Sequence, residues 1–488
     1  MEAAKKNNQL IDTRTEVSRQ EKTFLVNGTK KVPIRAEVAS KYSLFFRYLE
    51  NHPLTDPDEP VNLLIRNSGQ SIEIGPCRIL TGPELNGHAG RLVFLRDVYD
   101  IRSLLTNNTI VKLQSPFSDL PQVMARKDKI RQPFKDYVAN LVYDLRVYKQ
   151  VFDKLDSETI AEPEEVRMAV TEAIIRTEGP VFRRFFQDTI DELINLTDDF
   201  TPKEHQQHGF YFRNHLWEFI LSCPFAARAN LKPRRYAGDS GQMRMIYLND
   251  YQGDSTFSKL LHKHAVAHTA SQSVRNRIAL IPRLINDFRN DSQFPDSDKI
   301  DLLSVGSGAA FELNDIFKSP QDCSKYNFIL FDQDPVALEE AADLAGEIAK
   351  KIGAIPKINY IEGSVRTMLF SRKIMEPWGK FDFIYSMGLF DYLNSRVAAA
   401  VLNRLYQLIK PGGELVVGNF NVSNPSRYYM EYWGDWVLIH RTEEEFRSLF
   451  PDTSSATVRV IYDETGAQMF LDIKKEKQRI KKFEVCRN

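Results

Sequence analysis

The sequence has few cysteines and no long apolar run. Its four cysteines, Cys77, Cys223, Cys323 and Cys486, lie far apart and form no C-x-x-C pair. This spacing excludes a zinc ribbon and a disulfide framework, and it favours reduced thiols in a cytoplasmic protein. No stretch approaches 18 apolar residues in length, so we expect no membrane span. The polar N-terminus also lacks the apolar segment of a secretory signal.

An excess of charge is also missing. The 65 Lys and Arg residues balance the 65 Asp and Glu residues, which gives no support to a nucleic acid as the main partner. What the chain does have is length, 488 residues, and a hydrophobic share of 42%. These values predict two or three domains with full cores rather than a disordered chain.

The pattern of apolar residues divides the chain into four parts. Residues 1–20 read as a flexible tail. Short strand-like segments separated by turn-rich pieces over 21–112 predict a small β-barrel. Apolar residues three and four apart dominate 113–296, which predicts a helical region that serves as a lid or a spacer. Its position before the last part favours the lid.

The last part, 297–488, alternates strands and helices. This rhythm predicts a parallel α/β sheet with helices on both faces. Two final strands about Thr465 and Gly466 predict an antiparallel hairpin at the edge of the sheet. The expected fold is therefore α/β, preceded by a helical region and a small N-terminal β-barrel.

The stretch "IDLLSVGSGAAFEL", residues 300–313, joins a strand to a helix through Gly306, Ser307 and Gly308. Such a turn predicts a nucleotide site, although the two glycines also fit an ordinary sharp turn. Asp332 ends the next strand, where a carboxylate can accept hydrogen bonds from both ribose hydroxyls. Asp332 could instead cap the following helix, for which Asp334 before Pro335 is the better candidate.

The order of these motifs resembles class I S-adenosylmethionine-dependent methyltransferases: a glycine turn, an acid after the second strand, a third turn "EGSV", an aromatic exit from the fourth strand, "KPGG", and a final hairpin. The resemblance covers 298–475 and implies a Rossmann-like seven-stranded sheet and S-adenosyl-L-methionine as cofactor. The residues it assigns to the cofactor are Gly306, Ser307, Gly308, Asp332, Gln333, Gly363, Ser364, Val365, Ser386, Met387 and Gly388.

A narrower resemblance covers roughly 245–475. The pattern of Tyr251, Gly253 and Phe257, together with "ME…DW.LI.R" from Met430 to Arg441, is similar to a bacterial methyltransferase group. That group includes the enzyme that makes 3-hydroxypalmitic acid methyl ester. The similarity implies carboxyl O-methylation of a small, fatty-acid-like (3-hydroxy acid) substrate. The absence of the N/D-P-P-Y signature argues against amide and nucleobase amine acceptors.

Several residues are candidates for the acceptor end of the site. Asp391 and Tyr392 follow the fourth strand and are the catalytic candidates, although Asp391 also fits a helix N-cap. If the narrower resemblance holds, one of three arginines guides the substrate carboxylate, and aromatic side chains line an acyl slot. The arginines are Arg275, Arg277 and Arg441, and the aromatic residues are Phe257, Phe390 and Tyr392. Ion pairs and core packing are the competing interpretations.

His262, His264 and His268 raise the question of a metal. His264 and His268 are four residues apart and could share a helix face, but no carboxylate or cysteine completes a ligand set. We therefore expect no metal site.

The segment "VASKYSLFF" in the barrel resembles the D/N-x-S-x-x-G segment of PilZ domains, which are bacterial cyclic-di-GMP receptors. Ser40 matches the serine, while Val38 and Ser43 depart from the pattern. The paired arginines upstream are missing, with only Arg19 nearby, which argues against binding of the dinucleotide. Two hypotheses follow: a small-molecule methyltransferase, or a regulatory protein with a receptor barrel and a methyltransferase-like domain without turnover. Oligomeric state has no signal in the sequence.

Overall fold

The computed structural model describes most of the chain: residues 15–16, 22–40, 42–49, 59–67, 70–80, 88–96, 99–101, 104–105, 124–291, 299–370, 378–451 and 455–477. The chain forms two compact units, Met1–Lys127 and Asp128–Asn488. Each is described by itself.

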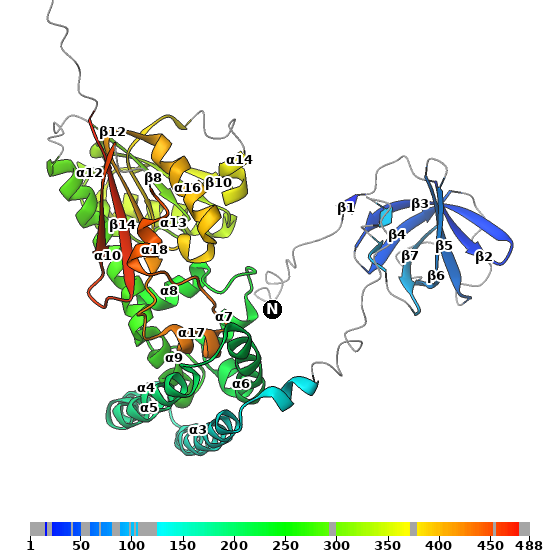
Figure 1. Ribbon diagram of the computed structural model, residues 1–488. Coiled ribbons are helices and arrows are strands. Elements are labelled where there is room, and N and C mark those ends of the chain that lie inside the picture. The colour runs from blue at the N-terminus through cyan, green and yellow to red at the C-terminus, as the bar shows by residue number, and fades with distance from the viewer. Residues whose placement is uncertain are drawn as a thin grey trace, which may run out of the picture. The chain divides into compact units, whose positions relative to one another are not determined.

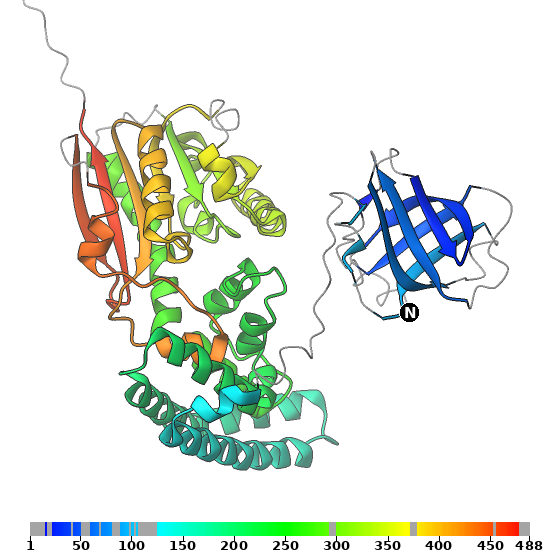
Figure 2. The ribbon, with the colours of Figure 1, turned by 45° about the vertical axis from the view of Figure 1, so that its right-hand side comes forward.

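The first unit is a closed barrel of six antiparallel strands, β2 to β7, with the short strand β1 (Thr15–Glu16) added beside β3 (Figure 2). The strands are β2 (Lys22–Asn27), β3 (Lys30–Ala39), β4 (Ser43–Tyr48), β5 (Val61–Asn67), β6 (Gln70–Leu80) and β7 (Ala89–Phe94). Pairing of β3 with β4 closes the ring. Alternate residues such as Leu44 and Phe46 are buried inside, as the two-residue period of a strand requires. Within the described residues, the predicted barrel is confirmed.

The second unit contains a seven-stranded sheet with the order β10-β9-β8-β11-β12-β14-β13. The first five strands in this order are parallel, and β14 is antiparallel to both of its neighbours. The strands are β8 (Ile300–Val305), β9 (Tyr326–Asp332), β10 (Lys357–Glu362), β11 (Phe381–Ser386), β12 (Ile409–Phe420), β13 (Ala456–Tyr462) and β14 (Gln468–Lys475). The predicted α/β sheet and its terminal hairpin are confirmed.

Helices cover both faces of this sheet (Figure 1). One face packs against α10 (Thr269–Asp291), α11 (Leu313–Ile316) and α13 (Pro335–Ile352). The other packs against α14 (Val365–Phe370), α16 (Ser395–Leu408) and α18 (Glu443–Arg447). The short helix α12 (Asp322–Lys325) precedes β9. Because the strand order reverses direction at β8, a crevice is expected where β8 and β11 end.

The helical region belongs to the same unit as the sheet. It has a separate core built around α3 to α9, and the segment after β12 enters that core as α17. Figures 1 and 2 both show α17 in orange among the green helices. The helices are α3 (Gln132–Glu158), α4 (Glu164–Thr177), α5 (Gly179–Thr197), α6 (Pro202–Ser222), α7 (Pro224–Leu231), α8 (Ser240–Leu248), α9 (Thr256–Ala267) and α17 (Arg427–Gly434).

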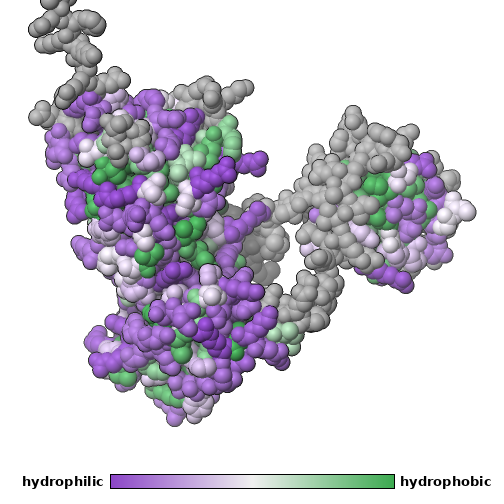
Figure 3. All heavy atoms as spheres, in the orientation of Figure 1, coloured by the Kyte–Doolittle hydropathy of each residue, from purple (hydrophilic) through white to green (hydrophobic). Residues whose placement is uncertain are grey.

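The surface of the second unit is mainly hydrophilic on the face shown in Figure 3, with small separate hydrophobic spots. Among the described helices, none combines the length and the apolar character that a membrane crossing needs.

Candidate functional site

A cavity of about 280 Å³ lies where β8 and β11 end. Its floor comes from the loops that follow strands β8, β9, β10 and β11. Its cover comes from helices α8 and α10 and from the segment before α8. The helical region therefore contributes directly to the cavity wall, as a lid would. Besides the residues discussed below, the lining includes Tyr236, Ser240, Ile278, Ile281, Phe311 and Leu389.

The predicted glycine turn forms one wall of this cavity. Gly306 and Gly308 have φ values of 66° and 55°, which disfavour any side chain. The N–H of Gly306 donates to the carbonyl of Phe331 at 2.8 Å, which fixes the turn to the neighbouring strand β9. Ser307 also lines the cavity. The turn thus presents backbone and a hydroxyl to a ligand.

Asp332 lies at the end of β9 and is 8% exposed. Its Oδ2 accepts from Gly308 N at 2.7 Å, and its Oδ1 accepts from Asp334 N at 2.9 Å. Burial raises the pKa of the carboxyl, while these backbone donors oppose the rise. Each oxygen keeps a second lone pair, so the fixed carboxylate can still accept from a ligand. The helix-capping role belongs to Asp334, which accepts from Val336 N at 3.0 Å.

The turn after β10 contributes Gly363 and Val365 to the lining, and Gln333 lines the cavity after β9. A Cβ on Gly363 would lie 2.5 Å from the Phe331 ring, so only glycine fits. Ser364 does not line the cavity: its Oγ accepts from Thr367 N at 3.2 Å at the start of α14. The side chain of Ser364 is therefore not placed to contact a cofactor in this cavity.

The exit from β11 contributes Met387 and Gly388 to the lining. Ser386 is fully buried and donates its hydroxyl proton to the carbonyl of Val305 at 2.7 Å. It ties β11 to β8 behind the cavity rather than facing it. Nine of the eleven predicted cofactor residues thus line one cavity, and the two serines support it from outside.

Asp391 faces the cavity and is 2% exposed. The helix-cap interpretation is wrong: α16 begins at Ser395, and the Asn394 side chain caps it by accepting from Val397 N at 3.0 Å. Oδ1 of Asp391 accepts from Phe420 N at 2.7 Å. Burial raises the pKa of Asp391 to about 6, against the opposing charge of two arginines. Such a group changes charge near neutral pH, as a proton donor or acceptor must.

Tyr392 lies beside Asp391. Its hydroxyl oxygen accepts from Trp436 Nε1 at 2.9 Å, and burial raises the pKa of the phenol. The residue as a whole is 42% exposed, and its hydroxyl lies against Gly238, where an added Cβ would approach it to 2.5 Å. With its acceptor position used by Trp436, the hydroxyl keeps its proton to donate.

Of the three candidate arginines, Arg277 alone lines the cavity. It donates to the carbonyl of Met387 at 3.2 Å and contacts Met243 Sδ at 3.4 Å. Arg275 instead donates to the carbonyls of Ile246 and Val266. Arg441 is 2% exposed and donates to the carbonyls of Phe390 and Leu393 and to Asn419. The hydrogen bonds of Arg275 and Arg441 therefore connect separate backbone segments of the fold.

The sequence reasoning missed an acidic residue that lines the same cavity as Arg277. Glu312 lines the cavity, accepts from the Tyr385 hydroxyl at 2.8 Å, and has a pKa raised by burial. Its place four residues after Gly308 was a usable signal. The predicted acyl-slot residues Phe257 and Phe390 are wrong, because both are fully buried in hydrophobic cores and do not line the cavity.

The segment before α8, which covers part of the cavity, is fixed to the start of α13 by polar contacts. Arg234 donates to Asp334 at 3.0 Å and to Glu340 at 2.7 Å, both on or next to α13. Tyr236 donates its hydroxyl proton to Asp334 at 3.2 Å. These contacts hold the cover over the end of the cavity where Asp332 lies.

The three histidines considered as metal ligands are neutral. Burial lowers the pKa of His262 to about 4, of His264 to about 3 and of His268 to about 4, so all three are neutral at physiological pH. Among the described residues, no group of three potential metal ligands comes together. His264 packs edge-on against Phe186, and Nδ1 of His268 is hydrogen-bonded to Ser426.

In the barrel, Ser40 serves its own turn. Its Oγ accepts from Tyr42 N at 3.2 Å and from Ser43 N at 3.0 Å. Val38, which departs from the receptor pattern, lies in β3. Arg19 lies outside the described residues.

No protein-family model matches the chain, and no curated protein is significantly similar to it. Similar solved structures include magnesium protoporphyrin IX methyltransferase from Synechocystis with bound S-adenosylmethionine (12% identity, 42% of this chain, 83% of that chain, TM-score 0.31). Others are the N-methyltransferase NodS from Bradyrhizobium japonicum (13%, 41%, 96%, 0.28) and a possible exported protein from Bordetella parapertussis (15%, 65%, 100%, 0.37). At these identities and TM-scores, the likeness carries no argument about the activity of this chain.

Proposed function

We propose that the Asp128–Asn488 unit transfers a methyl group from S-adenosyl-L-methionine to a carboxyl group of a small, fatty-acid-like acceptor. The observation that carries the proposal is the single cavity in which the glycine turn, Asp332 and Arg277 meet. Bound there, the cofactor supplies a sulfonium-activated methyl group.

The residues of the sheet side fit the cofactor. Gly306 and Gly308 leave room for close approach of a ligand to the backbone. Asp332 is held in place by two backbone donors and has free lone pairs for the two ribose hydroxyls. Gly363 and Val365 offer a narrow apolar wall to the adenine ring. Glu312, an acidic residue of the cavity wall, can accept from the ammonium of the methionine portion.

The residues of the acceptor side fit a carboxylate. Arg277 brings a guanidinium to the wall; none of the described ion pairs includes it, although its charge opposes the rise in the pKa of Glu312 and of Asp391. A guanidinium pairs strongly with a carboxylate by charge-assisted hydrogen bonds. Tyr392 can donate a second hydrogen bond, since its oxygen already accepts from Trp436. Together they would orient one carboxylate oxygen toward the methyl group and exclude water.

A carboxylate nucleophile is already charged at neutral pH, so it needs no general base. We assign Asp391 to orientation: in its protonated form it donates to the acceptor carboxylate, and a pKa of about 6 makes that form accessible. A hydroxyl acceptor would instead need Asp391 as the base. The narrower sequence resemblance, to the group that makes 3-hydroxypalmitic acid methyl ester, supports the carboxyl assignment.

For the barrel we propose a PilZ-like scaffold without dinucleotide binding. The serine that matches the receptor pattern, Ser40, is used within its own turn. The alternative function, a regulatory protein without turnover, requires cyclic-di-GMP to bind the full chain. Calorimetry with that dinucleotide distinguishes the two: no heat of binding is expected, and submicromolar binding would favour the regulatory alternative.

The function is tested by incubating the purified full chain with methyl-labelled S-adenosylmethionine and a bacterial lipid extract. We expect label in a lipid-soluble product. Tight binding of S-adenosylhomocysteine without any labelled product would contradict the proposal.

A further inference from the structure

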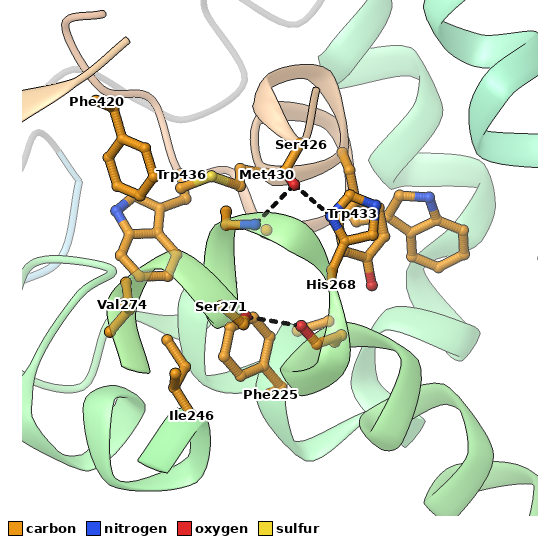
Figure 4. A pocket seen from close by; sticks show the side chains of 15 residues that line it. Phe225, Ile246, His268, Ser271, Val274, Phe420, Ser426, Met430, Trp433 and Trp436 are labelled. Carbon is orange, nitrogen blue, oxygen red and sulfur yellow. Dashed lines mark hydrogen bonds between the residues drawn. The ribbon is translucent and has the colours of Figure 1, made fainter. Parts of the chain in front are cut away.

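A second, smaller cavity adjoins the one described above. We call it the annex; it has a volume of about 30 Å³. Val274, Phe420 and Trp436 line both cavities, so these three side chains form the wall between them. Figure 4 shows them together on one side of the annex, with His268 and Trp433 on the opposite side.

The other walls of the annex are almost entirely apolar. They come from α7, α8, α9, α10 and α17, and include Phe225, Ala226, Ile246, Ala265, Met430 and Gly434. The three helices α7, α9 and α17 also form part of the buried core of the helical region. The annex is therefore a gap in a hydrophobic core that shares one wall with the methyl-transfer cavity.

The two serine hydroxyl groups in the lining are already used, whereas the Tyr429 hydroxyl makes no described hydrogen bond. Ser271 donates its hydroxyl proton to the carbonyl of Ala265 at 2.9 Å. Ser426 Oγ accepts from Ala270 N at 2.9 Å and is hydrogen-bonded to His268 Nδ1 (Figure 4). Among the described lining residues, Trp433 Nε1 is the one buried polar atom without a partner. The lining is therefore mainly apolar, and apolar cavities accept apolar guests.

The wall is built from the same residues that position the reaction zone. Trp436 donates to the Tyr392 hydroxyl at 2.9 Å, and Phe420 N donates to Asp391 at 2.7 Å. A group seated against Trp436 and Phe420 is therefore held at a fixed position relative to Asp391 and Tyr392.

We propose that the annex receives the terminal hydrocarbon of the acceptor and thereby sets its maximum length. This inference rests on the proposed function. A volume of about 30 Å³ is room for on the order of two water-sized groups. It therefore takes the last one or two carbons, while the rest of the acceptor lies in the main cavity between Arg277 and the wall. Ala226 and Gly434 line the annex but not the main cavity, and they act as length-determining residues.

The test measures binding of straight-chain carboxylates of increasing length to the full chain saturated with S-adenosylhomocysteine. In the wild type, affinity should rise about fourfold per methylene, the value for burial of one CH2, until the annex is full. In Ala226→Val and Ala226→Leu, the rise should stop one to two carbons earlier. The longest carboxylates should then bind these variants about tenfold more weakly than the wild type.

Two further variants keep the test decisive. Gly434→Ala adds one methyl that would meet the Cβ atoms of Ala229 and Trp436 at 3.6 Å, an ordinary contact, so it should fold and shorten the limit by about one carbon. It decides the question if the Ala226 variants fail to bind S-adenosylhomocysteine. Ala267→Leu, at an exposed position at the end of α9, is the matched control and should leave the length limit unchanged.

The outcomes separate the two proposals. If carboxylates bind and are methylated, yet the length limit is the same in the wild type and in Gly434→Ala, the annex proposal is wrong and the proposed function stands. If the wild type binds S-adenosylhomocysteine but no carboxylate of any length, both are wrong.

Discussion

The two ends of the cavity, one proposed to hold the cofactor and the other the acceptor, are built in different ways. The cofactor end consists of short contiguous turns at the ends of β8, β9, β10 and β11, and much of its bonding is backbone, as in the contacts of Asp332 with Gly308 and Asp334. The acceptor end is assembled from residues far apart in the sequence: Gly238, Arg277, Tyr392 and Trp436. The first end depends mainly on the sheet and its turns, with the segment before α8 as its cover, whereas the second depends on how the helical region and the segment after β12 pack over it.

This difference predicts that variants at the two ends have separable effects. Changes at the cofactor end should weaken the cofactor for every acceptor. Changes at the acceptor end should leave cofactor affinity intact and alter acceptor use. The variants below are ordered from the largest expected effect to the smallest.

Asp332→Ala should weaken binding of S-adenosylhomocysteine by roughly 1–3 kcal/mol, or about 5- to 150-fold, because the ribose loses its acceptor and the Gly308 N–H loses its partner. Calorimetry measures this directly. Asp343→Ala, at an exposed position on α13, is the matched control. Unchanged affinity in Asp332→Ala would remove this residue from the site.

Arg277→Met should raise KM for the carboxylate acceptor by about 10- to 100-fold, the value of a lost charge-assisted hydrogen bond. Affinity for S-adenosylhomocysteine should change by less than about threefold. Arg283→Met, exposed on the same helix, serves as the control. If Arg277→Met lost cofactor affinity instead, Arg277 would belong to the cofactor end and the comparison would fail.

Arg234→Ala should increase the dissociation rate of S-adenosylhomocysteine by about three- to tenfold, because the cover loses its ties to Asp334 and Glu340. Stopped-flow displacement gives this rate. An unchanged rate would show that the cover does not retain the cofactor.

Asp391→Asn tests the role of a carboxyl with a pKa of about 6. If protonated Asp391 orients the acceptor, wild-type kcat/KM should fall as pH rises through about 6, since the proton is lost there. Asn still donates, so the variant should keep activity within about threefold and lose this pH dependence. The opposite profile, activity that rises through pH 6 and disappears in the variant, would identify Asp391 as a general base and the acceptor as a hydroxyl compound.

The same contrast explains what the sequence could predict. The sheet, its hairpin and the glycine turn follow from local patterns, so nine cofactor candidates converge on the cavity. Ser364 and Ser386 face away because a motif gives positions and not side-chain directions. Arg275 and Arg277 are two residues apart on one helix and so point to nearly opposite sides, which only the packing of α10 reveals.

The aromatic residues show the same limit. From the sequence, Phe257 and Phe390 could line a pocket, although core packing is the favoured interpretation, and their burial shows that both belong to the core. The residues that do separate the cavity from the annex, Phe420 and Trp436, come from the segment that crosses from β12 into the helical region. Contacts of such long sequence separation leave no local pattern.

The central claim is methyl transfer to a carboxyl group, and the product's chemistry tests it most directly. After reaction with methyl-labelled S-adenosylmethionine and straight-chain acids, mild alkali should release the label quantitatively as methanol, because an ester hydrolyses under these conditions. A labelled product that resists alkali, as a methyl ether or an N-methyl compound does, would contradict the account.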